Sequence, residues 1–85
     1  MESQCILMGN LPAPPAEKEY QAWYALSLTN KISAGIIKVD ASGAFFEKFD
    51  SPKEAENAAV IVISLEPADG SQQPTLPLYA VARLN

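Results

Sequence analysis

Hydrophobic and polar side chains alternate along most of this chain, in short runs separated by turn-forming residues. Alternation with a period of two is typical of β-strands that are buried on one face. On this basis we expect six strands, at residues 5–9, 20–28, 33–40, 44–49, 59–65 and 78–84. The fifth run is apolar on both faces apart from Ser64, which is typical of a central strand covered on both sides.

The alternation also predicts which side chains share a face of a strand. In the second run, one face holds Tyr20, Ala22, Tyr24, Leu26 and Leu28, and the other holds Gln21, Trp23, Ala25 and Ser27. In the fourth run, Phe45 and Phe49 point to one side, and Phe46 and Lys48 point to the other. The aromatic side chains are therefore divided between the two faces of their strands.

Turn-forming residues separate the runs. The prolines of residues 11–15 fix the backbone dihedral φ, which predicts a stiff, extended connector. Asn30 can adopt a left-handed turn conformation. Asp40 can cap a turn with its carboxylate, and Gly43 can supply the positive φ at the exit of that turn. Residues 67–77 contain three prolines and a glycine, which predicts a long loop.

One short helix is predicted between the fourth and fifth runs, at residues 52–57. Ser51 would be its N-cap, Pro52 its first residue, and Glu54 could bond back to the cap. Together these elements predict a mostly antiparallel, all-β fold, a small β-sandwich of about six to seven strands with one short helix. We expect residues 1–85 to form a single domain, with an ordered core at about 5–84.

Composition and charge narrow the function classes. Of the 85 residues, 48% are apolar and 19% are charged, which is typical of a globular chain. The formal net charge of −4 argues against a nucleic-acid partner. The absence of histidine removes the commonest general base and zinc ligand, and Cys5 alone cannot form an internal disulfide. With no signal peptide or long apolar run, we expect a soluble piece with no catalytic residue, metal or cofactor.

Residues 66–75 carry the most distinctive polar chemistry. One interpretation is a recognition loop stiffened by proline, which contacts a protein partner through candidate residues Glu66, Asp69, Ser71, Gln73 and Thr75. The other interpretation is that these groups satisfy the backbone of the loop and hold a crossover between two strands. A calcium site is a weaker hypothesis, because two nearby acids are too few for an ion that takes six to eight oxygen ligands.

Trp23 is a candidate aromatic contact. With Tyr20 and Tyr24 it could form a stacking platform for a sugar or a peptide. Alternatively, all three rings are buried and their polar tips reach partners inside the protein. The chain has one tryptophan and three phenylalanines, so its core needs these rings.

Several sequence blocks resemble a known family. Residues 63–75, ISLEPADGSQQPT, resemble the signature VTLEPAGGSPQPT of the C-terminal domain of anti-sigma-K factors. Residues 11–15 and 20–23 look like the LP…P…YQLW block of that family. Residues 33–36 are similar to its SAGVF block, and residues 40–43 to its D-x-x-G turn. The chain departs from the signature at Asp69, Gln72 and Leu76, which replace a glycine, a proline and a second glycine.

This resemblance implies a regulatory module. In that family the domain is the extracytoplasmic end of a single-pass membrane protein, whose cytoplasmic end sequesters an alternative sigma factor until stepwise proteolysis releases it. The implied partners are regulatory proteases. The sigma factor and the membrane would be reached only through parts that are not among these residues, and no nucleic-acid contact is implied.

Two other classes stay open. The chain could be a β-sandwich binding module for carbohydrate or peptide on another bacterial surface protein. An enzyme is the least favoured class, because the spacing shows no catalytic arrangement. A homo-oligomer is a further hypothesis, since sheet edges invite pairing unless charges such as Lys38, Lys48 and Arg83 guard them.

Overall fold

The chain folds as two antiparallel sheets packed face to face. The computed structural model describes residues 3–27, 29–55, 58, 60–76 and 78–83. The strands in these ranges are β1 (Ser3–Asn10), β2 (Lys18–Ala25), β3 (Lys31–Ile37), β4 (Ala44–Ser51), β5 (Val60–Pro67) and β6 (Ala80–Arg83). All six correspond to predicted runs, and the predicted all-β sandwich is confirmed.

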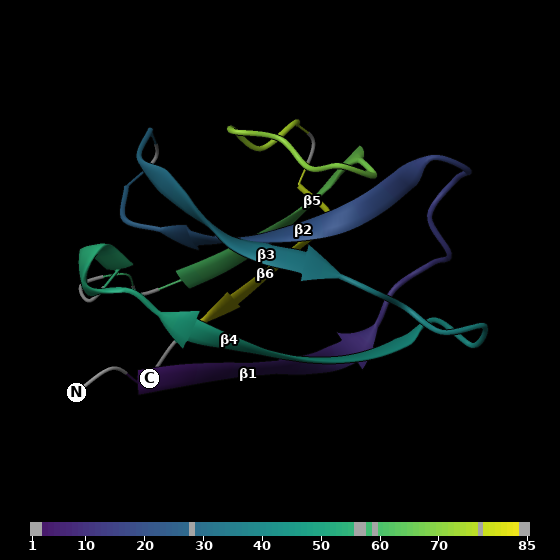
Figure 1. The fold of residues 1–85 in the computed structure, drawn as a ribbon, viewed down its shortest axis with the longest axis horizontal. Coiled ribbons are helices and arrows are strands. Elements are labelled where there is room, and N and C mark those ends of the chain that lie inside the picture. Colours follow the sequence, from purple (N-terminus) through teal and green to yellow (C-terminus); the bar gives the residue numbers. More distant parts are fainter. Residues whose placement is uncertain (1–2, 28, 56–57, 59, 77, 84–85) are drawn as a thin grey trace.

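The two sheets differ in size. The larger sheet has the order β3-β2-β5-β6, and the smaller one consists of β1 and β4. In Figure 1 the smaller sheet lies below the larger one, and the chain passes between the sheets after β1, after β3 and after β4. β5 lies between β2 and β6, so the prediction of a central strand for the fifth run is confirmed.

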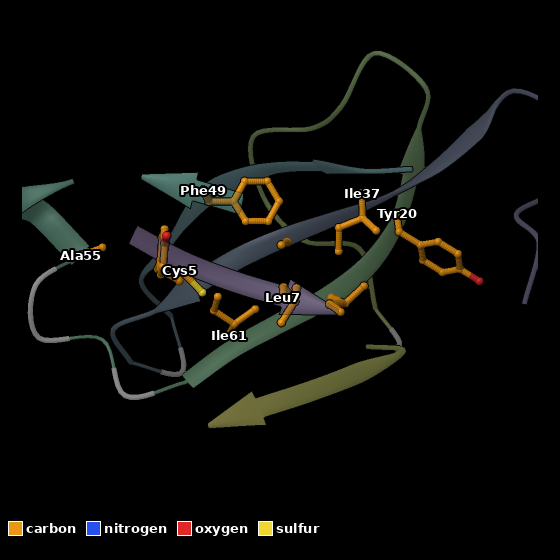
Figure 2. Close-up of a cluster of buried hydrophobic side chains, with 10 residues drawn as sticks. Cys5, Leu7, Tyr20, Ile37, Phe49, Ala55 and Ile61 are labelled. Carbon is orange, nitrogen blue, oxygen red and sulfur yellow. The ribbon is translucent and has the colours of Figure 1, made fainter. Parts of the chain in front are cut away.

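The hydrophobic core fills the space between the sheets. Its larger side chains come from both sheets and meet there in Figure 2. The buried cluster comprises Cys5, Leu7, Tyr20, Ala22, Tyr24, Ile37, Phe49, Ala55, Ile61 and Ile63. The phenol groups reach acceptors at its margin: Tyr20 Oη donates to the Pro12 carbonyl at 2.7 Å, and Tyr24 Oη donates to the Asp50 carbonyl at 3.2 Å. Burying these rings therefore leaves neither hydroxyl without a partner.

The second run ends earlier than predicted. β2 stops at Ala25, so Leu26 lies in a turn, and Leu28 lies outside the described residues. The amides of Leu26 and Ser27 both donate to the Asn30 carbonyl, and these turn bonds replace the strand pairing. The prediction of a left-handed Asn30 is wrong. Glu17 is the non-glycine residue that has positive φ in the described part of the chain.

The predicted turn at residues 40–43 is confirmed in detail. One carboxylate oxygen of Asp40 accepts hydrogen bonds from the Ser42 amide, the Ser42 hydroxyl and the Ala44 amide. Gly43 has φ of 89°, and a Cβ there would lie 2.5 Å from the Leu11 carbonyl oxygen. Both the backbone conformation and the close approach of Leu11 therefore require glycine.

The helical segment is shorter and tighter than predicted. A 3₁₀ turn at Lys53–Ala55 takes the place of the predicted helix at 52–57. Asn57 and the capping side chains of Ser51 and Glu54 lie outside the described residues. With so few residues, backbone bonds from i to i+3 are favoured over a full α-helical turn. Within the described ranges, no helix is long and apolar enough to cross a membrane.

Candidate functional site

The outer face of the larger sheet, turned away from β1 and β4, carries a second buried layer. Because side chains alternate along a strand, β2 and β5 send half of their residues to this face. The buried ones are Gln21, Trp23, Val62, Ser64 and Glu66. Because β5 and β6 are antiparallel neighbours, residues 68–79, described except for Pro77, form a long hairpin loop. Figure 1 shows this loop lying over the outer face of β2 and β5, and we call it the crossover loop for that position only. The predicted long loop is therefore confirmed, and it covers a sheet face.

Glu66 is the centre of this layer, and its carboxylate is fully buried. Its Oε1 accepts hydrogen bonds from the Ser71 hydroxyl at 2.8 Å and the Thr75 hydroxyl at 2.7 Å. Its Oε2 accepts from the Thr75 amide at 2.6 Å and from the Ser64 hydroxyl. A carboxylate has about four lone-pair sites, so all its acceptor capacity is used. Two of the residues that donate to it belong to the crossover loop, which is thereby fixed to β5.

Two residues of β2 extend these contacts across the sheet. The Trp23 indole Nε1 donates to the Ser64 hydroxyl at 2.9 Å, and that hydroxyl in turn donates to Glu66. The Gln21 side chain pairs with Ser71: its Nε2 donates to the Ser71 carbonyl at 3.2 Å, and its Oε1 accepts from the Ser71 amide at 3.0 Å. We call Gln21, Trp23, Ser64, Glu66, Ser71 and Thr75 the Glu66 network.

The Glu66 network leaves no buried polar group unpaired. Across the described residues, every buried side-chain nitrogen and oxygen has a hydrogen-bond partner. Burial raises the pKa of the Glu66 carboxyl, but the bonds from Ser64, Thr75 and Ser71 lower it by more, so the net pKa lies below its ordinary value. Glu66 is therefore a stably ionised carboxylate inside the protein.

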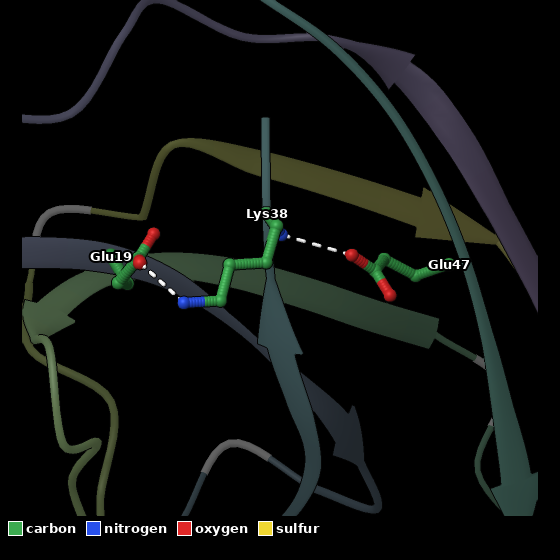
Figure 3. A network of polar contacts seen from close by, with 3 residues as sticks. All are labelled: Glu19, Lys38 and Glu47. Atoms are coloured by element: carbon green, nitrogen blue, oxygen red, sulfur yellow. Dashed lines mark hydrogen bonds and ion pairs between the residues drawn. The ribbon is translucent and has the colours of Figure 1, made fainter. Parts of the chain in front are cut away.

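A second glutamate lies directly across the sheet from Glu66. Glu19 is its partner in the register of β2 and β5, and like charges at such positions repel each other. The Glu19 carboxylate instead contacts Lys38 Nζ at 2.7 Å, as Figure 3 shows. The Lys38 amide donates to Glu47 on β4 at 2.9 Å, which links the two sheets at this end. Glu19 has its own cation, and Glu66 is stabilised by neutral donors alone.

The structure divides the five predicted loop residues into two groups. Ser71 and Thr75 donate to the buried Glu66, so these three residues hold the crossover loop. The side chains of Asp69 and Gln73 are exposed and make no hydrogen bond within the described residues. The expected crossover between two strands is wrong, because β5 and β6 are adjacent antiparallel strands. The first group does fix the loop through its polar groups, and partner recognition stays a prediction.

Trp23 lies at the floor of the layer. Its side chain is 0% exposed, so the ring offers no surface for stacking unless the crossover loop moves.

The sequence interpretation missed Gln21 and Ser64 as members of the Glu66 network. The signal was the polar residue at Ser64 in an otherwise apolar strand, two positions before Glu66 and hence on the same face.

Other candidate chemistry is limited. Burial raises the pKa of the Cys5 thiol, which lowers its reactivity at neutral pH. In the described part of the chain, no three His, Cys, Asp or Glu side chains lie close enough together to hold a metal ion. A hollow of about 400 Å³ lies between the ends of β2 and β5 and the loop, with Ala25, Val62 and Leu78 in its lining. Val62 is the register partner of Trp23, so the hollow adjoins the Glu66 network.

Comparison with known protein families identifies the family of this chain. Residues 1–81 match the model of the family described as anti-sigma-K factor rskA, C-terminal. The chain belongs to this family. The match confirms the resemblance seen in the sequence blocks, and it places the chain among the regulatory domains of anti-sigma factors. No curated protein and no solved structure matches the chain.

Proposed function

We propose that this chain is the non-enzymatic sensor domain of a membrane-anchored anti-sigma factor and lies on the extracytoplasmic face of the membrane. There it controls the release of an alternative sigma factor. The observation that carries the proposal is the family match over residues 1–81. We take residues 1–85 as one such domain, with its ordered core at about 5–84.

The site supports regulation rather than catalysis. Glu66 is a fully buried acid whose pKa is lowered by its hydrogen bonds, and all its acceptor positions are occupied by the crossover loop and by Ser64. A general base needs a free lone pair within reach of a substrate proton. Glu66 has none to offer while the loop is closed, so its role is to hold the loop.

The proposed mechanism is control of protease access. The folded domain acts as a cap on the chain that tethers it to the membrane, and opening of the crossover loop changes the access of regulatory proteases to that tether. Asp69 and Gln73, which are exposed and unused by the Glu66 network, are the loop groups available to a protein partner. Ser71, Thr75 and Glu66 set the free energy of opening.

The gene that encodes this chain provides a direct test. We expect it to encode, ahead of this region, a sigma-factor-binding segment and one apolar stretch of about 20 residues. A sigma-factor gene should lie directly upstream. A reading frame with neither segment would contradict the proposal.

A reporter assay tests the mechanism in cells. Glu66→Gln in the full-length protein should raise transcription from a promoter that depends on the cognate sigma factor, because the loop opens more often. Glu19→Gln, at the facing position of β2, is the matched control and should leave the reporter unchanged. Unchanged transcription with Glu66→Gln, in a protein shown to be destabilised, would contradict loop opening as the trigger.

The hollow beside the Glu66 network favours a second candidate, a β-sandwich binding module for carbohydrate or peptide. Its largely apolar lining would accept a small apolar group of such a ligand. A glycan or peptide array, followed by measurement of ligand-induced shifts in Tm, tests this. Leu78→Glu in the lining should abolish a genuine shift, and the exposed Leu76→Glu should not.

A further inference from the structure

The outer face of the smaller sheet is apolar and uncovered. On β1, Ile6 is 56% exposed and Met8 is 65% exposed, and on β4, Phe46 is 58% exposed. Met8 lies directly opposite Phe46 in the register of the two strands, and Ile6 lies opposite Lys48. Ile6, Met8 and Phe46 therefore form one continuous surface, which we call the β1–β4 patch.

The free edge of β1 adjoins this patch. In the part of the chain that the structure describes, β1 pairs with β4 alone, so its other edge has no strand beside it. Natural edge strands are usually blunted by charge, by proline, by short length or by bulges, because an open edge pairs with other chains. β1 has eight residues, Ser3–Asn10, and contains neither a charged residue nor a proline.

The other sheet edges carry such protection. β4 contains Glu47, Lys48 and Asp50. β3 begins at Lys31, and its pairing with β2 is interrupted by a register shift. β6 is four residues long. β1 is thus the one strand among those described whose free edge is long, uncharged and flanked by exposed apolar side chains.

We propose that β1 pairs with β1 of a second copy of this chain, in antiparallel orientation about a two-fold axis at Leu7. The two small sheets then become one four-stranded sheet of order β4-β1-β1-β4. A two-fold axis at Leu7 keeps Ile6 and Met8 of both copies on the same outer face, because side chains alternate with a period of two. Ile6 of each copy lies opposite Met8 of the other.

In this register, the β1–β4 patches of the two copies lie side by side on one face of the joined sheet. Each row across the joined sheet runs from Phe46 and Met8 of one copy to Ile6 and Lys48 of the other, which follows from the pairing of β1 with β4. The apolar positions are contiguous across the axis, and the aliphatic part of Lys48 ends each row. The charged residues of β4 stay one strand away from the axis. Residues 4–10 of one copy face residues 10–4 of the other.

The uncharged edge of β1 favours pairing with a second copy of this chain over pairing with a charged peptide. A charged extended partner would find no complementary charge on β1, whereas two identical neutral strands bring no like charges together. The net charge of −4 resides on other elements. This inference does not depend on the anti-sigma function, because it uses only the edge and the patch.

Analytical ultracentrifugation of the 85-residue chain over a range of concentrations tests the pairing. We expect a monomer–dimer equilibrium, and Met8→Glu should weaken the dimer by at least about tenfold in Kd, because it replaces the apolar contact of Met8 with Ile6 of the other copy, which occurs twice in the dimer. Val81→Glu is the matched control: Val81 is 62% exposed, but it lies on β6. Circular dichroism confirms that each variant is folded. A chain that stays monomeric, or equal weakening by the two variants, would overturn the proposal.

Disulfide trapping tests the register independently. In a Cys5→Ala background, Ile6→Cys with Met8→Cys places two cysteine pairs across the axis, within the Cα separation of about 4.4–6.8 Å that disulfides adopt. Mild oxidation should give a covalent dimer. Ile6→Cys alone leaves its two cysteines diagonal to each other, and it should crosslink far more slowly. Crosslinking of the single variant as fast as the double variant would overturn the two-fold axis at Leu7.

Discussion

The two outer faces of the sandwich present opposite surfaces. On the larger sheet, the outer face holds Trp23 and Glu66, both 0% exposed, under the crossover loop. On the smaller sheet, the outer face holds Met8 and Phe46, and both are more than half exposed. The crossover loop covers the outer face of the larger sheet, and no described segment covers the outer face of the smaller sheet.

The difference shows what makes a sheet face into a core. Both faces arise from the same alternation of side chains in their strands, and both present large apolar groups. The larger sheet acquires a cover because Glu66 offers a buried anchor to the hydroxyls and amide of the loop. No residue of β1 or β4 has an equivalent set of loop donors among the described residues, so the β1–β4 patch stays exposed beside the free edge of β1.

The largest contrast is expected from truncating one aromatic ring on each face. Trp23→Ala should lower the free energy of unfolding by about 3–5 kcal/mol, because it removes a fully buried ring. Phe46→Ala should change it by about 1 kcal/mol or less, because its ring is mostly exposed. Urea denaturation, at a concentration where the chain is monomeric, measures both values. Equal losses would show that the two faces are equally buried.

The next largest effect is expected at the anchor of the covered face. Glu66→Gln should lower the free energy of unfolding by about 2 kcal/mol, because its hydrogen bonds lose charge assistance and the new NH₂ group faces donors. Glu19→Gln should change it by about 0.5 kcal/mol or less, because its Lys38 partner is a solvent-exposed cation. Thermal and urea melts measure the pair. A loss at Glu19 as large as that at Glu66 would contradict the anchoring role.

Acidification should gradually remove the stabilisation that the Glu66 carboxylate gives to the covered face. The Glu66 carboxyl has a folded pKa below its unfolded value of about 4.3, so its stabilisation is fully present at higher pH. This stabilisation declines as the pH falls below that value and through the folded pKa. Protonation removes less than the substitution does, because the shape of the side chain is retained.

The stability of the wild type minus that of Glu66→Gln, measured from neutral to acidic pH, isolates this contribution. Asp40 also titrates: the Ser42 hydroxyl and backbone amides of its turn lower its pKa, and this contribution is common to both proteins and cancels. The difference should be constant near neutral pH and should shrink in acid. A stability difference that grows on acidification would mean that folding raises the pKa of Glu66, and it would contradict the lowered pKa assigned to this carboxyl.

The smallest effect is expected at a single loop donor. Thr75→Val removes the hydroxyl that donates to Glu66 but keeps the shape of the side chain, and it should lower the free energy of unfolding by about 1 kcal/mol. Thr75→Ser keeps the hydroxyl and should lie closer to the wild type. Hydrogen exchange at the Ser71 amide should accelerate in Thr75→Val, because the loop opens more often. Unchanged exchange would show that this bond does not hold the loop.

Local chemistry made much of the fold predictable. The turn at residues 40–43 follows from Asp40 and Gly43 alone, because both of its requirements, a side-chain cap and a positive φ, are met within the turn. The strands and the faces of Phe46 and Phe49 followed from alternation in the same way. The family resemblance rested on short blocks in the right order, and the match over residues 1–81 confirms it.

The structure differs from the predictions at the ends of elements and at contacts between residues that lie far apart in the chain. The alternation continues past Ala25 and predicts a longer β2, whereas the chain turns after Ala25 through bonds to Asn30. The predicted helix after β4 became a 3₁₀ turn. The site was identified in part: the loop and Glu66 stood out, but the contribution of Gln21 depends on a pairing with Ser71, 50 residues later.

The sequence by itself determined the strands, the tight turn and the division of side chains between strand faces, because these depend on residues that are neighbours in the chain. The tertiary structure alone decided which outer face is covered. That choice depends on whether a distant loop can satisfy a buried carboxylate, and hydrogen bonds between β5 and residues 71–75 satisfy it on one side of the sandwich. On the other side, β1 keeps an open edge beside an exposed apolar patch, because no segment among the described residues supplies such donors there.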